Sequence, residues 1–352
     1  MKFGLFLSYQ RHHPEQDSTS LYRDMHELAV AADANGFHRI WFPEHHLIHF
    51  LQAPSSLLTA VHASQHVRCR VGTAVVVLPY HHPLIAAGEI AAADHLTGGR
   101  LDVGVARGAY RYEFDIFEQD FAKSRAQFEE SLDIIQAALT SDQALTHHGE
   151  HFNFEHASVY PRPLQTPHPP LWVGGQSTGT VEWAVRRRHN VLHALFVWPL
   201  QHAAKIADCF HATRKEEGIP DGELKLGMSR MTLVVDDERK IDKHIDEALH
   251  NWRIHRALHD YTQNVDDRGY VAPVQDDADP SREETAANLM IGTLDDVAAK
   301  VAAYEAIGVD ELNLWMTFGP QQEEILRSIE LFGKIIRKYS DAETRQAVGA
   351  QR

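Results

Sequence analysis

Short apolar, β-favouring runs alternate with amphipathic stretches along almost the whole chain. The segment after the first run places five apolar residues on one helical face: Leu21, Met25, Leu28, Ala29 and Ala32. The runs that we expect to be strands are Phe3–Leu7, His38–Phe42, Val71–Leu78, Leu101–Ala106, Leu171–Gly174, Val191–Val197, Leu226–Val235 and Glu311–Met316. Strands that alternate with helices in one domain are parallel and are joined by crossover helices. Eight such units predict an α/β fold, a single (β/α)8 TIM barrel, with an open doubly wound sheet as the alternative.

The chain of 352 residues suits one barrel domain, which we place at residues 1–340, followed by a C-terminal tail at 341–352. An acidic, proline-containing insertion precedes the eighth strand and covers residues 259–285. Long irregular segments in compact barrels are usually functional or disordered. We expect a mobile lid here, with simple disorder as the alternative. A second segment, His147–Pro170, predicts a short extension before the fifth strand.

Charge and cysteine content narrow the class of protein. The 34 basic and 49 acidic residues give a net charge of −15, which argues against a nucleic-acid partner because such proteins cluster Lys and Arg. Cys69 and Cys209 lie far apart without metal-ligand spacing, so they predict no disulfide framework and favour a cytoplasmic location. The apolar N-terminal run is too short for a signal peptide, and no stretch is long enough to span a bilayer.

The first candidate for chemistry follows the second predicted strand. In (β/α)8 barrels the active site lies at the C-terminal ends of the strands. Glu44, His45 and His46 stand at such an end. A carboxylate beside an imidazole can orient it and set its charge. A polar turn with no catalytic role explains the same residues equally well.

The second candidate is an anion site after the fourth and fifth strands. Arg107 follows the fourth strand, and Arg125 lies at the start of a helix for which Ser124 and Gln127 suggest a capping box. Guanidinium groups pair with phosphate. The small residues of 174–180 lead into another helix, whose N-terminus favours an anion. Each feature alone is also typical of surface ion pairs or ordinary caps; together they predict a phosphate cradle.

The 25 histidines raise a third possibility, a metal-dependent hydrolase barrel. Such enzymes place a His-x-His pair on the first strand, whereas this strand ends with Phe6-Leu7-Ser8-Tyr9. The doublet His12-His13 lies beyond it, and adjacent residues rarely bind one ion together. We therefore predict no metal at the active site and keep the hydrolase as an alternative.

Taken together, these motifs resemble the bacterial-luciferase family of flavin-dependent monooxygenases. The matching segments keep their order along essentially the whole chain: Glu44–His46, Val71–Pro79 with His82-Pro83, Gly99–Gly108 and Gln176–Trp183. The resemblance implies an FMN cofactor used as FMNH2 and delivered by a separate NAD(P)H:flavin reductase. It implies that O2 forms a C4a-peroxyflavin, which inserts one oxygen atom into a small organic substrate by Baeyer–Villiger chemistry or hydroxylation. It also implies a homodimer.

The resemblance assigns roles to individual residues. His45 matches the family's catalytic histidine, and Glu44 matches the carboxylate that would poise it. Ala74 and Val75 match a position where the family often has a cis peptide against the flavin ring. The residues that would hold the FMN phosphate are Arg107, Arg125, Gln176, Ser177 and Thr180.

Two departures separate the chain from luciferases themselves. Ala106 stands where luciferases have a reactive cysteine, and Gln176 stands where a glutamate is common. The resemblance therefore does not extend to light emission or to the luciferase aldehyde. An F420-dependent hydride-transfer enzyme of the same fold and a non-catalytic partner subunit remain alternatives. Six aromatic residues suggest an apolar ligand: Phe50, Tyr110, Phe114, Phe196, Trp198 and Trp315.

Overall fold

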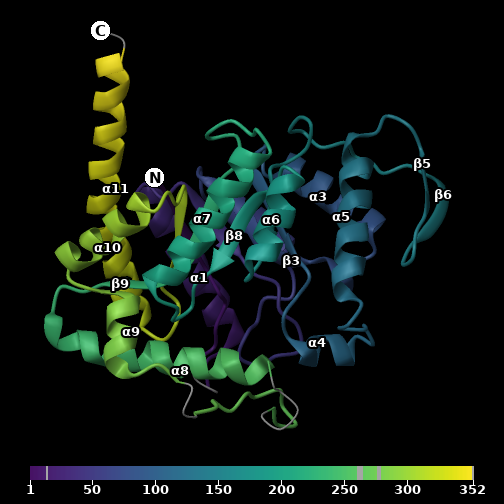
Figure 1. Ribbon diagram of the computed structural model, residues 1–352. Helices are drawn as coiled ribbons and strands as arrows, with labels where there is room; N and C mark the ends of the chain where they lie inside the picture. Colours follow the sequence, from purple (N-terminus) through teal and green to yellow (C-terminus); the bar gives the residue numbers. More distant parts are fainter. Residues whose placement is uncertain (13–14, 260–264, 276–278, 351–352) are drawn as a thin grey trace.

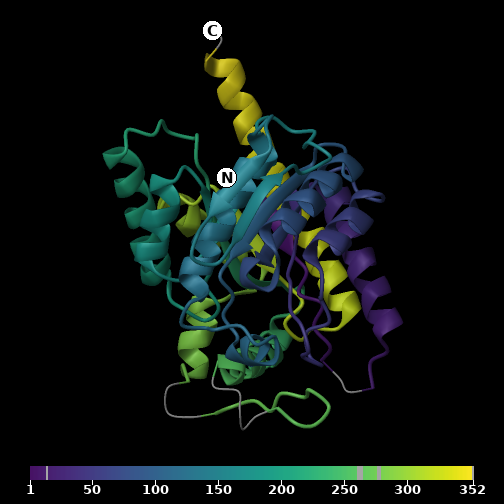
Figure 2. The same cartoon turned by 90° about the vertical axis from the view of Figure 1, so that its right-hand side faces the viewer.

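The computed structural model describes residues 1–12, 15–259, 265–275 and 279–350 and contains a closed barrel of parallel strands surrounded by helices (Figures 1 and 2). The barrel strands are β1 (Lys2–Phe6), β2 (Arg39–Phe42), β3 (Arg70–Val77), β4 (Leu101–Ala106), β7 (Leu171–Gly174), β8 (Asn190–Ala194), β9 (Leu226–Val234) and β11 (Glu311–Trp315). They pair in this order, and β11 pairs with β1, which closes the barrel. The predicted (β/α)8 TIM barrel is confirmed.

Helices surround the barrel. They are α1 (Ser18–Ala34), α2 (Ser56–Ser64), α3 (Pro83–Leu96), α4 (Arg111–Ile116), α5 (Ser124–Thr140), α6 (Thr178–Arg186), α7 (Leu200–Glu216), α8 (Ile241–His259), α9 (Arg282–Asn288), α10 (Leu294–Ala306) and α11 (Gln322–Ala350), with 3-10 turns η1 (Leu78–Tyr80) and η2 (Glu238–Lys240). The helices α4 and α8 lie at one end of the barrel (Figure 1). The apolar face predicted for α1 is buried as expected. Within the described ranges, no helix is both long enough and apolar enough to cross a membrane.

The start of α5 differs from the prediction. Its N-cap is Lys123, and no side chain caps the helix. The Ser124 hydroxyl instead donates backwards to the Phe121 carbonyl at 2.8 Å, and the Gln127 amide reaches the Pro79 carbonyl at 3.3 Å. The predicted capping box is therefore wrong, because Ser124 is already inside the helix and has a nearer acceptor.

The segment between β9 and the last barrel strand contains more regular structure than we predicted. A short strand, β10 (Met290–Gly292), pairs with the C-terminal end of β9, beyond the residues of β9 that pair with β11. The helix α8 runs along one end of the barrel, and the described residues 265–275 lie beneath it in Figure 1. Parts of the expected lid, residues 260–264 and 276–278, lie outside the described residues, so its mobility stays a prediction. The predicted boundary at residue 340 falls within α11.

The extension before the fifth barrel strand is a hairpin. Its strands are β5 (Leu145–His148) and β6 (Asn153–Ala157), which pair antiparallel. It projects from the barrel beyond α5 in Figure 1, on the opposite side of the molecule from α11.

Buried polar groups occupy the barrel interior towards the N-terminal ends of its strands. The Arg39 guanidinium contacts Asp102 at 3.0 Å and Glu311 at 2.5 Å, and all three side chains are buried. The Trp41 indole N–H lies 2.9 Å from the Glu311 carboxylate. Burial raises the pKa of Glu311, although the charge of Arg39 opposes this. These side chains fill this part of the interior and leave the C-terminal ends of the strands for a cavity.

Candidate active site

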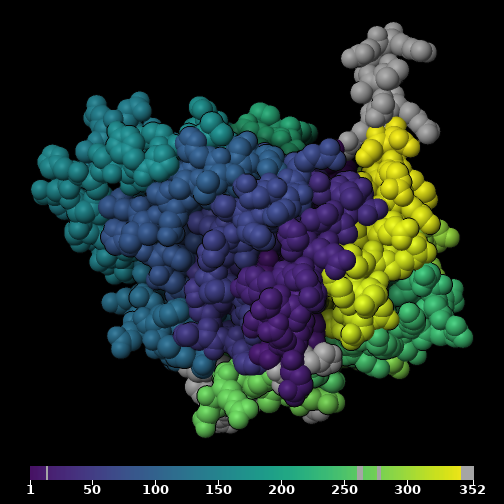
Figure 3. Space-filling view, turned by 180° about the vertical axis from the view of Figure 1, so that it is seen from behind, coloured from purple at the N-terminus to yellow at the C-terminus, as the bar shows by residue number. Residues whose placement is uncertain are grey.

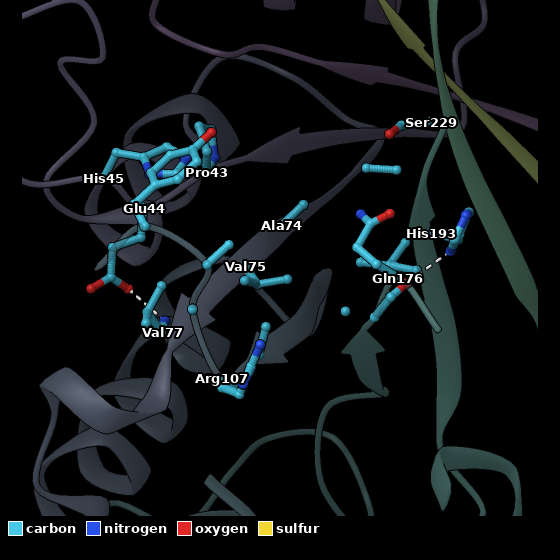
Figure 4. A pocket seen from close by; sticks show the side chains of 18 of the residues that line it. Pro43, Glu44, His45, Ala74, Val75, Val77, Arg107, Gln176, His193 and Ser229 are labelled. Carbon is cyan, nitrogen blue, oxygen red and sulfur yellow. Dashed lines mark hydrogen bonds between the residues drawn. The ribbon is translucent and has the colours of Figure 1, made fainter. Parts of the chain in front are cut away.

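A cavity of about 560 Å³ lies at the C-terminal ends of the barrel strands (Figure 4). A cavity at this position and of this size fits a cofactor or a small ligand. All nine residues that the sequence predicted for the site line it: Glu44, His45, Ala74, Val75, Arg107, Arg125, Gln176, Ser177 and Thr180. They come from β3, from the segments that follow β2, β4 and β7, and from α5 and α6, so the barrel brings together residues that are far apart in sequence.

The middle of the cavity is formed by β3. The peptide bond between Ala74 and Val75 is cis, as the resemblance implied, and the pairing of β3 with β4 is irregular at this point. In Figure 4 these residues lie between His45 on one side and Gln176 on the other. Gly174 of β7 contacts this region closely, since a Cβ there would lie 3.0 Å from the Val75 side chain.

Two arginine side chains lie at one end of the cavity. Arg125 donates a hydrogen bond to the Thr180 hydroxyl at 3.2 Å and forms an ion pair with Glu129 on its own helix. Arg107 has no carboxylate within 4 Å among the described residues, and its guanidinium lies 4.9 Å from the centre of the Phe121 ring. Burial and the nearby charge of Arg125 lower the pKa of Arg107. The two guanidinium groups therefore carry more positive charge than the single carboxylate beside them offsets.

The N-terminus of α6 lies at the same end. Ser177 is the N-cap, and its hydroxyl accepts from the Thr180 amide at 3.3 Å. Gly175 lies so close to Thr180 that a Cβ on Gly175 would be 2.4 Å from the Thr180 side chain. Amide groups at a helix start, hydroxyl groups and two arginines form the donor set that binds phosphate.

The other end of the cavity holds Glu44, which is buried. Its carboxylate accepts hydrogen bonds from His46 Nε2 and His81 Nε2, each at 2.7 Å, and from the Val77 amide at 3.0 Å. Burial alone would raise the pKa of Glu44, but the hydrogen bonds from the two histidines and the amide lower it. Burial alone would lower the pKa of His81, and its hydrogen bond to Glu44 raises it. Glu44 is thus an ionised, fully partnered group.

His45 does not pair with Glu44, and our prediction of that pairing is wrong. Its Nδ1 lies 3.5 Å from a carboxylate oxygen of Glu113 and makes no hydrogen bond among the described residues. Its ring stacks on that of Tyr110 with the ring centres 4.9 Å apart. Neighbouring side chains in an extended segment point in opposite directions. Glu44 therefore turns towards β3, as Figure 4 shows, and His45 turns away from it.

Glu113 and His81 belong to this cluster and were missed as site residues. Glu113 comes from α4 and accepts from the His46 amide at 2.6 Å and from the Tyr80 hydroxyl at 3.2 Å. The six residues of α4 are too few to show a periodic pattern. His81 could have been found, because it follows the end of β3 as Glu44 follows the end of β2.

A further missed residue is His255 of α8, the helix that leads into the insertion. Its Nδ1 lies 2.5 Å from the Tyr110 hydroxyl, and its Nε2 lies 2.8 Å from the Gln10 amide nitrogen. Burial lowers the pKa of His255 well below its usual value, so the ring is neutral. Because α8 lies between β9 and the insertion, only its packing in three dimensions brings this ring to the cavity.

The remaining lining includes both aromatic and polar side chains. Three of the six aromatic residues suggested from the sequence line the cavity: Tyr110, Phe196 and Trp315. Phe50, Phe114 and Trp198 do not; Phe114 is fully buried elsewhere, and Trp198 is 46% exposed. His193 of β8 was not predicted; its Nδ1 donates to the Gly175 carbonyl at 2.8 Å, and burial lowers its pKa to about 4.

Comparison with known proteins places this chain in a family. The profile of the family described as luciferase-like monooxygenase matches residues 1–311. The chain is 32% identical over 356 aligned residues to the oxygenase component of flavin-dependent trigonelline monooxygenase from Acinetobacter baylyi, an alignment that covers 97% of this chain and 96% of that protein.

Solved structures support the same fold. Monooxygenase RslO1 from Streptomyces bottropensis superposes with a TM-score of 0.82 at 24% identity, over 97% of this chain and 100% of that one. An F420-dependent secondary alcohol dehydrogenase superposes with a TM-score of 0.75 at 16% identity, over 95% and 97% of the two chains. Since the family profile covers most of the sequence, the chain belongs to the luciferase-like monooxygenase family.

Proposed function

We propose that the protein is the oxygenase component of a two-component monooxygenase, which uses FMNH2 from a separate NAD(P)H:flavin reductase and O2. It would insert one oxygen atom into a small, apolar organic substrate. The observation that carries this proposal is the layout of the cavity, with a cationic cradle at one end, His45 at the other and the Ala74–Val75 peptide between them. The flavin-dependent relative supports the choice of cofactor.

The residues of the cradle fit the phosphate of FMN. Arg107, which lacks a carboxylate partner in the described part of the chain, would pair with this dianion, as would Arg125. Ser177, Thr180 and the first amides of α6 would donate to its oxygens, and Gln176 would add an amide group. The tricyclic ring would rest against Ala74 and Val75, where small side chains leave room for a flat group.

The protein's own residues would prepare and protect the reaction. When bound, reduced FMN supplies the electrons that activate O2, which is chemistry that no side chain provides. His45 would hold or move a proton on its imidazole ring, whose buried Nδ1 lies beside the Glu113 carboxylate and makes no hydrogen bond in the described structure. The aromatic wall of Tyr110, Phe196 and Trp315 would exclude water and bind the apolar substrate.

An F420-dependent hydride transfer is the second candidate, since an F420-dependent dehydrogenase shares the fold. Anaerobic titration of the protein with reduced FMN, and separately with reduced F420, distinguishes the two. We expect saturable binding of reduced FMN with one site per chain and much weaker binding of F420. Tight binding of F420 with no binding of FMN would replace the proposal with the second candidate.

We also propose that the chain forms a homodimer through α3. Ile85 and Leu96 on α3 are large apolar residues with exposed fractions of 61% and 60%. Large apolar groups exposed on a helix are typical of a subunit interface. Light scattering coupled to size exclusion should give twice the mass of one chain, and a monomer at micromolar concentration would refute this proposal.

A further inference from the structure

Three histidines meet on the outside of the barrel, away from the cavity. His26 lies on α1, His62 lies on α2, and His66 lies in the turn after α2. One ring nitrogen from each lies within 4.8 Å of the other two. The ring centres of His26 and His66 are 4.4 Å apart, and the other two pairs are 5.4 Å apart. None of the three lines the cavity, and the cluster has no part in the proposed function.

The spacing of two of these residues explains why they face the same way. His62 and His66 are four residues apart, and the His66 amide still donates to the Ala63 carbonyl at 2.9 Å, so the helical turn continues to His66. Residues four apart on a helix lie on one face, one above the other. His26 reaches the same place from α1, on the facing helix.

The three rings lack the partners that usually explain clustered histidines. No carboxylate lies within 4 Å of any of them in the described ranges, and no side-chain hydrogen bond to their ring nitrogens is present there. The Nδ1 of His26 is buried with no hydrogen-bond partner. A buried polar atom without a partner costs roughly 1–3 kcal/mol, so its presence requires an explanation. A ligand that accepts lone pairs from several imidazoles would provide one.

We propose that His26, His62 and His66 bind one divalent transition-metal ion of the Zn2+ type, with water as the fourth ligand. Imidazole nitrogens suit Zn2+, Ni2+ and Cu2+, whereas Mg2+ and Ca2+ prefer oxygen ligands, which this cluster lacks. Tetrahedral Zn2+ with nitrogens at 2.0–2.1 Å separates them by about 3.3–3.4 Å. His62 and His66 are exposed, so small rotations of their side chains bring the nitrogens to this spacing.

The metal would join two helices that lie on either side of β2 in the sequence. The helix α1 leads into β2, and α2 follows it. Figure 3 shows the face formed by these N-terminal segments, beside the surface of α11. An ion that binds only the folded state stabilises it by mass action. The site would therefore raise thermal stability without a role in the oxygenation reaction.

Metal titration of the untagged, full-length, chelator-treated protein tests this proposal. Zn2+ is titrated in competition with a chromophoric chelator, and Co2+ is titrated while its visible spectrum is recorded. The variants are His66→Gln and His26→Gln, and the matched control is His148→Gln, which removes an exposed histidine from the β5–β6 hairpin. Thermal unfolding without metal shows whether each variant is folded.

We expect the wild type and His148→Gln to bind one more equivalent of Zn2+ than either cluster variant. Only these two proteins should give the intense visible bands of tetrahedral Co2+ and a Zn2+-dependent rise in melting temperature. Equal stoichiometry and affinity in all four proteins would overturn the proposal, because the other histidines would then account for the binding. Octahedral Co2+ spectra in the wild type would also contradict the proposed coordination.

Discussion

The two ends of the cavity differ in how far their charges are already balanced. At the cradle, Arg107 and Arg125 point at partly exposed space, and a single carboxylate, Glu129, pairs with one of them. At the opposite end, buried Glu44 is surrounded by three hydrogen-bond donors. The first end has binding capacity that the protein itself does not use. The second end is complete without a ligand.

This difference separates residues that we expect to bind a ligand from residues that stabilise the folded protein. Groups with unused hydrogen-bonding capacity can be removed with little loss of folding stability but a large loss of ligand affinity. Removal of a group whose hydrogen bonds are all made within the protein should lower folding stability more than ligand affinity, because it leaves buried donors without acceptors. His45 lies between the two cases, since it is held by stacking on Tyr110 while its Nδ1 makes no hydrogen bond in the described structure.

The largest expected effect is on affinity at the cradle. The double substitution Arg107→Ala with Arg125→Ala should weaken binding of reduced FMN roughly 100- to 10,000-fold, since each charge-assisted hydrogen bond contributes about 1.5–3 kcal/mol. Anaerobic fluorescence titration measures this. Arg111→Ala, which removes an exposed arginine of α4 that does not line the cavity, is the control and should bind normally. Unchanged affinity in the double variant would show that the cradle does not hold the phosphate.

At the paired end, Glu44→Ala should lower the free energy of unfolding by about 2–3 kcal/mol, because two imidazoles and the Val77 amide lose their acceptor. Urea denaturation of the apoprotein measures the change. The exposed Glu155→Ala on β6 should change stability by less than about 0.5 kcal/mol. If both variants had the same stability, the view of Glu44 as a supporting group would be refuted.

A smaller change in folding stability should accompany the titration of His81, because the loss of its proton affects only one of the three donors to Glu44. The folded pKa of His81 is raised above its usual 6.5, so its contribution to stability is present below pH 6.5 and is lost as the pH rises through the folded value. The folded pKa of Glu44 is lowered below 4.5, so its contribution is lost as the pH falls through that lower value. Urea midpoints of the wild type should therefore fall above pH 6.5.

The variant His81→Gln provides the control for this pH dependence. It keeps a hydrogen-bond donor at position 81 but cannot titrate, so the fall in stability above pH 6.5 should become shallower. A wild-type curve identical to that of His81→Gln would mean that the hydrogen bond to Glu44 does not favour the protonated imidazole.

The smallest expected effect concerns the start of α6. Ser177→Ala should cost about 1 kcal/mol of stability, because the helix loses its cap. Ser177→Asp keeps a capping oxygen and therefore stability, but its charge should weaken binding of reduced FMN by about threefold to tenfold. Melting temperature and anaerobic titration separate the two effects. Normal affinity in Ser177→Asp would place the phosphate away from this helix.

The sequence predicted the barrel from local patterns, and it predicted nine residues of the cavity lining from the strand ends and from the family resemblance. Each barrel strand is an apolar run, and the C-terminal ends of barrel strands converge, so residues such as His45, Arg107 and Ser177 had to meet. The strand β10 was missed because three residues show no periodicity. The apparent capping box at Ser124 failed because the motif does not fix where a helix begins.

Pairings within the site could not be predicted from the sequence. Adjacent residues suggested that Glu44 poises His45, but the direction of each side chain sends Glu44 to His81 and leaves His45 beside Glu113 and Tyr110. His255 reaches the cavity only through the packing of α8 against the barrel. Such contacts depend on orientations in three dimensions that residue spacing does not encode.

The central claim, that this cavity supports oxygen activation by reduced FMN, is tested most directly by stopped-flow mixing. The anaerobic complex of the protein with reduced FMN is mixed with oxygenated buffer, and absorbance spectra are recorded over time. We predict a transient whose spectrum differs from those of both reduced and oxidised FMN, and which decays much faster in His45→Ala. Direct conversion to oxidised FMN at the rate of free flavin, with no transient in the wild type, would contradict the account.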